Sequence, residues 1–230
     1  VTNRDAWCYN SSKKELGRNI KRMLDTYHID LLKYQRKCKG DDPKKWPALE
    51  AKNLISDKKE IAWTRALKKK VSQHQFLSYS PKIIRPSLYR PFSKQYLYFT
   101  RDLNECVYQI PACFPVAEAN NEMICVTGIG SGAFSCVLVD VIPDLNMLAA
   151  GSQCFPRYVY DLKPKKSGSK LEHYTKREAI TDEALEHFRK AYPEQAKKIT
   201  KEHLFYYIYG LLHHPDYRKE YEHNLVKQLP

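Results

Sequence analysis

The spacing of apolar side chains changes along the chain and predicts helices at both ends with strands between them. From residue 12 to residue 39, apolar positions recur at steps of three and four, which predicts one long amphipathic helix. Ser12-Lys13-Lys14-Glu15 has the form of a capping box, and Gly40 is a natural stop. The stripe comprises Leu16, Ile20, Met23, Leu24, Tyr27, Leu31, Tyr34 and Cys38, so lysines and arginines mostly face outward.

A second helix is predicted from Asp57 to about Val71, after a loop that carries Trp46. Its last turn holds Lys68, Lys69 and Lys70. Cations in the last turn of a helix stabilise it through the helix dipole, and they can also bind phosphate. The triplet is therefore equally compatible with a solvated helix end and with a phosphate contact.

Beyond residue 80, short β-type runs alternate with proline-containing turns. The predicted strands are Gln95–Thr100, Glu122–Thr127, Ser135–Ile142 and Arg157–Tyr160, followed by a basic loop at Lys163–Lys170. Helices return with starts at Thr181 and Thr200, a break at His213-His214-Pro215 and a final helix beyond it.

The pattern predicts an α+β fold, with a mixed or antiparallel sheet in the middle and amphipathic helices at both ends. We expect a single domain with a basic helical part (1–80), a strand-rich part (81–163) and a helical C-terminal part (164–230).

The formal net charge of +13 is concentrated at one end of the chain. Residues 1–80 hold 19 Lys and Arg against 9 Asp and Glu, whereas residues 81–163 hold 7 of each. A concentrated basic surface with many aromatic residues favours a nucleic-acid partner, because neutralising phosphates releases counterions. The alternative is a solvated face that serves solubility.

The seven cysteines are odd in number, and no two have Cys-x-x-Cys spacing. Most lie in apolar runs, which is typical of buried reduced thiols in a cytoplasmic protein. We find no signal peptide and no apolar stretch long enough to span a bilayer. The chain begins with Val1 and ends with Pro230, as expected of part of a longer polypeptide.

Few residue groups suggest catalysis or metal binding. Gly128–Ala133 resembles a nucleotide-binding turn, but a strand follows where that motif needs a helix, so a hairpin is the better interpretation. Glu50-Ala51-Lys52 resembles half of a nuclease site, although it falls in a loop. Cys154 has no recognisable base, and adjacent His213 and His214 point apart. We therefore expect no catalytic residue, metal or cofactor.

The segment Arg85–Tyr98 is the richest local signal, with three cations among four aromatics and two prolines. Arginine can fork onto guanine or clamp a phosphate. A stiff structural corner with buried aromatics would carry the same pattern.

Four sequence blocks occur in a distinctive order along the chain. They are Asn3-Arg4-Asp5-Ala6-Trp7-x-Tyr9-Asn10, Tyr89-Arg90-Pro91-Phe92 with Tyr96–Phe99, Gln153-Cys154-Phe155-Pro156-x-Tyr158, and Leu204–His213 with Pro215-x-Tyr217-Arg218-x-x-Tyr221. From residue 3 to residue 230 the chain resembles the C-terminal specificity domain of type ISP restriction-modification enzymes, which are often labelled helicases.

This resemblance implies a non-catalytic target-recognition domain that reads double-stranded DNA. Its parent would carry a nuclease, a helicase-like ATPase and an adenine methyltransferase upstream. The residues expected at the DNA are Arg85, Arg90, Lys94, Lys163, Lys165, Lys166, Lys170, Lys68, Lys69 and Lys70, with Asn120 and Asn121 as base readers. Two alternatives stay open, namely a docking module for the upstream parts and a metal-dependent nuclease.

Overall fold

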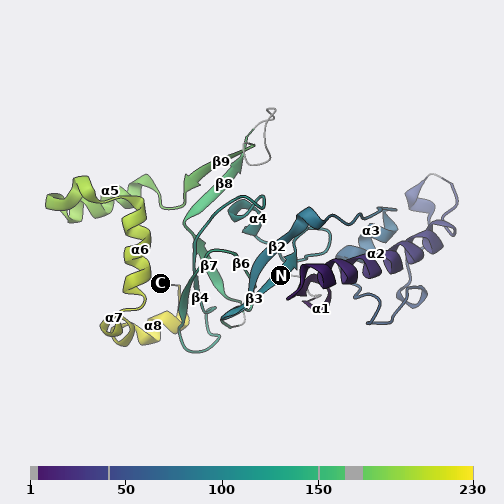
Figure 1. Cartoon of the computed structure of the whole chain (residues 1–230), viewed down its shortest axis with the longest axis horizontal. Coiled ribbons are helices and arrows are strands. Elements are labelled where there is room, and N and C mark those ends of the chain that lie inside the picture. Colours follow the sequence, from purple (N-terminus) through teal and green to yellow (C-terminus); the bar gives the residue numbers. More distant parts are fainter. Residues whose placement is uncertain (1–4, 41, 150, 164–172, 230) are drawn as a thin grey trace. The chain divides into compact units, whose positions relative to one another are not determined.

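The computed structural model describes residues 5–40, 42–149, 151–163 and 173–229, and the chain divides into two compact units. The first holds residues 1–87 and 94–107, and the second holds residues 88–93 and 108–230. Helices and short strands occur in both (Figure 1), so the α+β prediction is confirmed. That the chain acts as one recognition domain of three parts stays a prediction.

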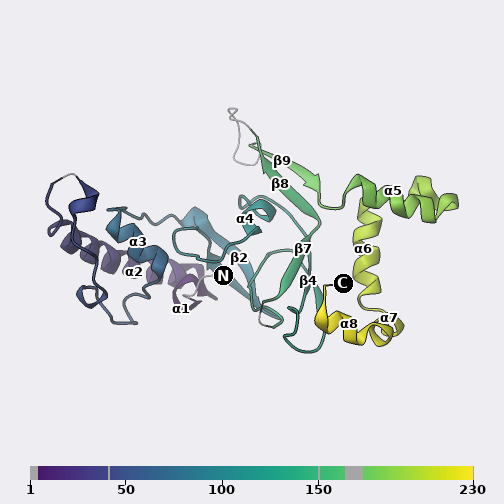
Figure 2. The same ribbon diagram turned by 180° about the vertical axis from the view of Figure 1, so that it is seen from behind.

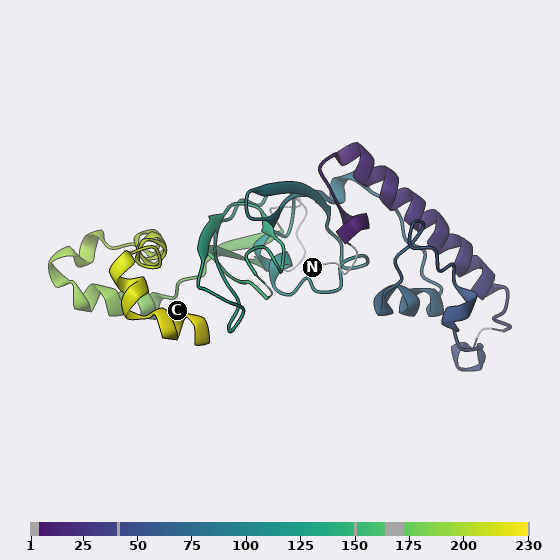
Figure 3. The same ribbon diagram turned by 90° about the horizontal axis from the view of Figure 1, so that it is seen from below.

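The first unit is built on one long helix. In chain order its elements are α1 (Asp5–Cys8), β1 (Tyr9–Asn10), α2 (Lys13–Gln35), 3-10 turns at Pro43–Lys45 and Ala51–Asn53, α3 (Arg65–Ser72), a 3-10 turn at Pro81–Ile83, and most of β2 (Ile84–Arg90) and β3 (Ser93–Tyr98). Strand β3 lies between β1 and β2 and pairs antiparallel with β1, Tyr9 facing Leu97. Figure 3 shows α3 on one side of α2.

Helix α2 begins where the sequence predicts and ends earlier. The Ser12 hydroxyl accepts a hydrogen bond from the Glu15 amide at 3.3 Å, which satisfies one free N–H of the first turn. The predicted stripe is buried from Leu16 to Tyr34, whereas Cys38 lies beyond the end of the helix and is only partly buried. The helix ends at Gln35 because the amides of Lys37 and Cys38 bond to carbonyls three residues back, a 3-10 geometry that tightens the chain before Gly40.

Buried polar groups of α2 hold the segment that follows it. The Tyr27 hydroxyl donates to the Gln75 carbonyl at 2.7 Å, and the Tyr34 hydroxyl donates to the Pro47 carbonyl at 2.8 Å. The carboxylate of Asp30, only 1% exposed, accepts from the Ile55 amide at 2.6 Å and pairs with Lys33 at 3.1 Å. The loop after α2 is therefore fixed by specific bonds in spite of its irregular backbone.

The predicted start of the second helix at Asp57 is wrong. Asp57 instead closes an isolated turn, its side chain accepting from the Lys59 amide at 2.8 Å. The helix α3 begins at Arg65, where the Thr64 hydroxyl accepts from the Leu67 amide at 3.3 Å. Asp57 and Thr64 both have side chains that accept hydrogen bonds from nearby backbone amides. The sequence pattern therefore does not distinguish a residue that caps an isolated turn from one that caps a helix.

The second unit combines antiparallel strands with four C-terminal helices. Its elements are α4 (Ile110–Cys113), β4 (Met123–Val126), β5 (Cys136–Val139), β6 (Ile142–Pro143), β7 (Gln153–Pro156), β8 (Tyr158–Leu162), β9 (Tyr174–Glu178), α5 (Asp182–Ala191), a 3-10 helix at Pro193–Lys198, α6 (Lys201–Leu211), α7 (Pro215–Glu220) and α8 (Glu222–Lys227). Strand β4 lies between β5 and β7, β8 pairs with β9, and β6 borders β2. Figure 2 shows the same ribbon from behind.

The core of this unit lies between the β4–β5 hairpin and the C-terminal helices. Ile124, Val126 and Cys136 pack against Phe205 of α6, with Leu212 and Leu225. The glycine-rich turn at 128–133 joins β4 to the antiparallel β5, so the hairpin interpretation is confirmed. Among the described helices, none is long and apolar enough to cross a membrane.

The sequence pattern missed four of the described strands, β1, β2, β7 and β9, and it merged others. Strand β2 was not predicted because Pro86 lies within it, and proline removes a hydrogen-bond donor from a strand. Strand β9 was missed because its residues are mostly polar. The predicted run Ser135–Ile142 divides into β5 and β6, and the predicted last helix divides at Tyr221 into α7 and α8.

We predict that Asp30→Ala destabilises the first unit by about 2 kcal/mol, because it removes charge-assisted bonds that are almost fully buried. Urea unfolding would measure the loss. Asp25→Ala is the matched control, since Asp25 lies on the same helix but is exposed. Equal effects of the two substitutions would contradict the anchoring role of Asp30.

We predict that three thiols resist alkylation in the folded chain. Burial raises the pKa of Cys113 and of Cys136 to about 11, and a hydrogen bond with Cys154 together with burial raises the pKa of Cys125. At pH 8 a thiol with a pKa of 11 is reactive thiolate in roughly one molecule per thousand. Mass spectrometry after brief iodoacetamide treatment should show these three unmodified, and all seven modified in urea. Rapid labelling of Cys125 in the folded state would contradict the prediction.

Candidate nucleic-acid interface

Helix α2 presents a row of exposed cations opposite its buried stripe. The exposed residues are Lys13, Lys14, Arg18, Lys21, Arg22, Lys33, Arg36 and Lys37, the last two just past its end. Three of them lie over aromatic rings of the same unit: Lys13 is 4.9 Å from Tyr96, Lys21 is 5.0 Å from Tyr79, and Arg22 is 5.2 Å from Trp7. Such contacts hold the cations close to the surface while leaving them available to a polyanion.

The lysine triplet of α3 divides into three environments. Lys69 is exposed, and Lys68 is half-buried at the edge of a pocket. Lys70 is only 21% exposed, and its ammonium pairs with Asp102 at 2.8 Å and with the Gln75 side chain at 3.1 Å. Lys70 therefore stabilises the fold, and Lys69 is the member best placed for a phosphate.

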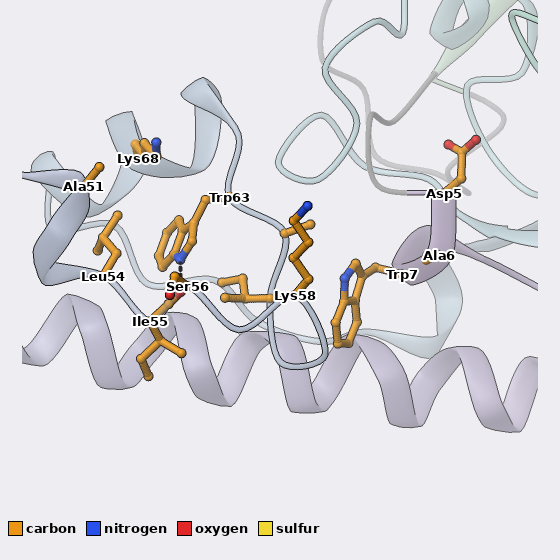
Figure 4. Close-up of a pocket in the computed structure, with 12 residues that line it drawn as sticks. Asp5, Ala6, Trp7, Ala51, Leu54, Ile55, Ser56, Lys58, Trp63 and Lys68 are labelled. Atoms are coloured by element: carbon orange, nitrogen blue, oxygen red, sulfur yellow. Dashed lines mark hydrogen bonds between the residues drawn. The ribbon is translucent and has the colours of Figure 1, made fainter.

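A pocket of about 530 Å³ opens beside this lysine triplet in the first unit (Figure 4). Two indoles, Trp7 and Trp63, lie in its lining with Leu54, Ile55 and Ile61, and Lys58 and Lys68 add positive charge. The Trp63 indole N–H donates to the Ile55 carbonyl at 2.9 Å, which fixes the ring in the wall. The pocket is thus apolar and aromatic, with positive charge from its lysines.

The segment Arg85–Tyr98 forms the β2–β3 hairpin. Arg85 is half-buried in β2, and Lys94 is exposed on β3. The Arg90 guanidinium pairs with Asp144 at 2.9 Å, donates to the Tyr89 carbonyl at 2.6 Å and lies 4.0 Å from the Tyr89 ring. Because the Asp144 carboxylate is only 2% exposed, Arg90 neutralises a buried charge and thereby stabilises the base of the hairpin turn.

The two asparagines before β4 differ in their surroundings. The Asn120 side chain is exposed, whereas Asn121 is 4% exposed. The Asn121 amide donates to the carbonyls of Cys113 and Tyr158, and its oxygen accepts from the amides of Glu122 and Tyr158. These four bonds occupy both hydrogens and both acceptor positions of the side-chain amide. Asn121 therefore has no free side-chain group with which to contact a base.

The basic segment after β8 lies mostly outside the residues that the structure describes. Lys163 is exposed, and its amide donates to the His173 carbonyl at 2.8 Å. Lys165, Lys166 and Lys170 lie outside the described residues. Two exposed cations that the sequence did not single out, Lys176 and Arg177, lie on β9, and Lys176 is 3.6 Å from the centre of the Tyr158 ring.

A charged network that sequence reasoning missed fixes α6 in the second unit. Arg157 pairs with Glu122 at 2.7 Å and with Glu202 at 2.6 Å, and the Tyr206 hydroxyl donates to Glu122 at 2.7 Å. Partial burial opposes the ionisation of Glu122, but the bonds from Tyr206 and Arg157 outweigh it and lower its pKa. Burial likewise opposes the charge on Arg157, and its two carboxylate partners still raise its pKa. No local sequence pattern marks these contacts, which join residues up to 84 positions apart.

The residues of the possible nuclease triplet do not form a catalytic arrangement. Glu50 and Lys52 pair with each other at 3.1 Å on an exposed 3-10 turn. Within the described ranges, no three acidic, histidine or cysteine side chains are grouped as metal ligands.

Exposed cations interleaved with aromatic rings on an α+β scaffold are typical of a nucleic-acid-binding module. A family model described as the Type ISP C-terminal specificity domain matches residues 1–230, so the chain belongs to this family of specificity domains.

Three solved structures resemble the whole chain. One is a DrdV–DNA complex, at 31% identity and a TM-score of 0.83, of which this chain covers 20%. The ATP-dependent Type ISP enzyme LlaBIII bound to DNA has 29% identity and a TM-score of 0.79, with 13% covered. A nuclease-deletion mutant of the Type ISP enzyme LlaGI with a DNA substrate mimic has 28% identity and a TM-score of 0.77, with 19% covered. The chain thus spans a fifth or less of each of these proteins, and no curated protein matches it.

We predict that Glu122→Gln lowers the free energy of unfolding by about 1–2 kcal/mol at pH 7, because the bonds to Arg157 lose their charge assistance. Since folding lowers the pKa of Glu122, its contribution is present above its unfolded value of 4.5 and is lost as the pH falls through the folded value. The difference from the unsubstituted chain should therefore shrink toward pH 3.

Urea unfolding at pH 7 and pH 3.5 would measure this dependence. Glu186→Gln is the matched control, because Glu186 pairs with Arg189 on the exposed face of α5 and such pairs contribute about 0.3–0.5 kcal/mol. A Glu122→Gln effect that is independent of pH would be incompatible with the network.

Proposed function

We propose that this chain reads a sequence in double-stranded DNA for a larger restriction-modification polypeptide, and that it is not itself catalytic. The observation that carries the proposal is that three enzymes resembling the chain over its full length were solved with DNA or a DNA mimic. The family description, a specificity domain, supports a recognition role in place of a catalytic one. The free cysteines support a cytoplasmic location.

We propose that the exposed cations contact the DNA backbone and that the partly buried cations support them. The row on α2, with Lys69 of α3, is suited to backbone phosphates, which set affinity and register. Lys94 and Lys163 are proposed as further phosphate contacts, with Lys165, Lys166 and Lys170 from the sequence that follows Lys163. Arg85, Arg90, Lys68 and Lys70 are proposed in supporting positions, because each is partly buried or already bonded.

Base reading is proposed for exposed polar side chains outside regular elements. Asn120 precedes β4 with an exposed amide, and an asparagine amide can contact adenine in a bidentate manner. Its backbone is fixed, since its carbonyl accepts from the Tyr160 hydroxyl at 2.7 Å. A fixed backbone with a free side chain is the arrangement that a base reader needs.

A second role, docking against the upstream methyltransferase and helicase parts of the same polypeptide, is favoured by α6. Tyr207 and Ile208 are exposed on this helix although they are largely apolar. Burial of such side chains is the ordinary source of affinity between domains.

We predict that the chain binds random duplex DNA with a dissociation constant of about 10⁻⁴–10⁻⁶ M at physiological salt and more tightly as salt is lowered. Replacing Lys14, Arg18 and Lys21 by glutamine should weaken binding to all sequences and flatten the salt dependence by roughly one unit of slope per lost phosphate contact. Fluorescence anisotropy across a salt series measures both.

Two matched variants sharpen this experiment. The same three positions changed to keep their charge, Lys14→Arg, Arg18→Lys and Lys21→Arg, should retain the slope. Asn120→Ala should leave random-duplex affinity unchanged and relax sequence selection at one position. Absence of DNA binding even at low salt would refute the proposed function and favour the docking role.

A further inference from the structure

The turn between β2 and β3 holds a phenylalanine that folding alone does not account for. The turn has two residues, Pro91 and Phe92, and Phe92 has a φ of +63°. Proline fixes its own φ near −65°, so the pair has the φ pattern of a type II turn. The second position of that turn favours glycine or asparagine, because a side chain with a Cβ is strained at positive φ.

Packing does not account for this residue either. The Phe92 side chain is 97% exposed, the highest value among the large apolar side chains that the structure describes. An apolar ring in contact with water and on a disfavoured backbone gives no stability to the folded chain. Neither the backbone conformation nor the packing of the folded chain therefore favours a phenylalanine at this position.

The base of the turn is held in place on the β2 side. Arg90, the last residue of β2, pairs with the buried Asp144 carboxylate and lies over the Tyr89 ring. Asp144 is itself fixed, since its amide donates to the Leu88 carbonyl at 3.0 Å and its carboxylate accepts from the Asn146 amide at 3.0 Å. With Pro91 stiffening the turn, the ring projects from a rigid support.

Arg90 and Lys94 lie two residues before and two residues after Phe92 in the sequence. Arg90 keeps 40% of its side chain exposed, and Lys94 is exposed on β3 two residues after Phe92. A flat, exposed apolar ring suits duplex DNA, because stacked bases present flat apolar faces of the same kind.

We propose that Phe92 is a wedge that inserts between neighbouring base pairs of the bound duplex and unstacks them. This inference rests on the proposed DNA-binding function and adds the contact that deforms the DNA. Apolar wedges of this kind kink the duplex and separate one base step. Arg90 acts here as a positioning residue for the turn.

The test uses 2-aminopurine, a base analogue that fluoresces when it is unstacked, placed at successive positions of a bound duplex. The unsubstituted chain should raise the fluorescence at one step, and Phe92→Asn should abolish the rise and weaken binding roughly tenfold. Asparagine tolerates positive φ, so this variant relieves the backbone strain and is not expected to unfold the hairpin. Phe92→Leu, which keeps an apolar wedge, should retain part of the rise.

Phe76→Ala is the matched control, because Phe76 is 61% exposed in the first unit, and it should keep the full signal. Retention of both the rise and the affinity in Phe92→Asn would overturn the wedge while leaving DNA binding intact. Absence of DNA binding by the unsubstituted chain would refute the proposed function itself. A p-benzoylphenylalanine at position 92 that crosslinks to protein in place of the DNA strand would also overturn the inference.

Discussion

Burial of β4 on both of its faces is the constraint around which the second unit is arranged. A strand without solvent contact must pair its backbone groups along both edges, which β5 and β7 do in antiparallel register. Phe205, Leu212 and Leu225 of the C-terminal segment cover Ile124 and Val126. The two residues that lead into the strand, Asn121 and Glu122, bind Tyr158 and Arg157 and thereby fix the start of β8 and the position of α6.

Helix α2 has a comparable role in the first unit, where its two faces perform different tasks. The buried face carries Asp30, Tyr27 and Tyr34, whose polar atoms bind carbonyl and amide groups of the following segment. The opposite face carries the exposed cations. Because most of these cations lie on one helix, they keep fixed spacings, whereas the same side chains on a flexible loop would lose more conformational entropy on binding a phosphate backbone.

Local features of the fold were predictable from the sequence, and long-range contacts were not. The caps at Ser12, Thr181 and Thr200 bond to amides three residues on, as their sequence patterns indicate, because capping is a local interaction. The pairs Arg90–Asp144 and Arg157–Glu122 join residues far apart in the chain, and no periodicity encodes them. Among the candidate site residues, Lys69, Lys94, Lys163 and Asn120 are exposed as a DNA contact requires, whereas Asn121 and Lys70 are held by neighbours that only the tertiary structure supplies.

The block Tyr89-Arg90-Pro91-Phe92 shows how a structure separates residues that maintain a fold from residues that meet a partner. Tyr89 and Arg90 contact each other, Arg90 neutralises the buried Asp144, and Pro91 sets the turn, so the fold alone explains these three. Phe92 is left with an exposed ring and a strained backbone. A position that costs stability and gains no internal contact owes its residue type to something outside the folded chain. By the same reasoning, an exposed side chain on a fixed backbone, such as that of Asn120, is a better candidate for partner contact than Arg90, whose guanidinium is already bonded within the fold.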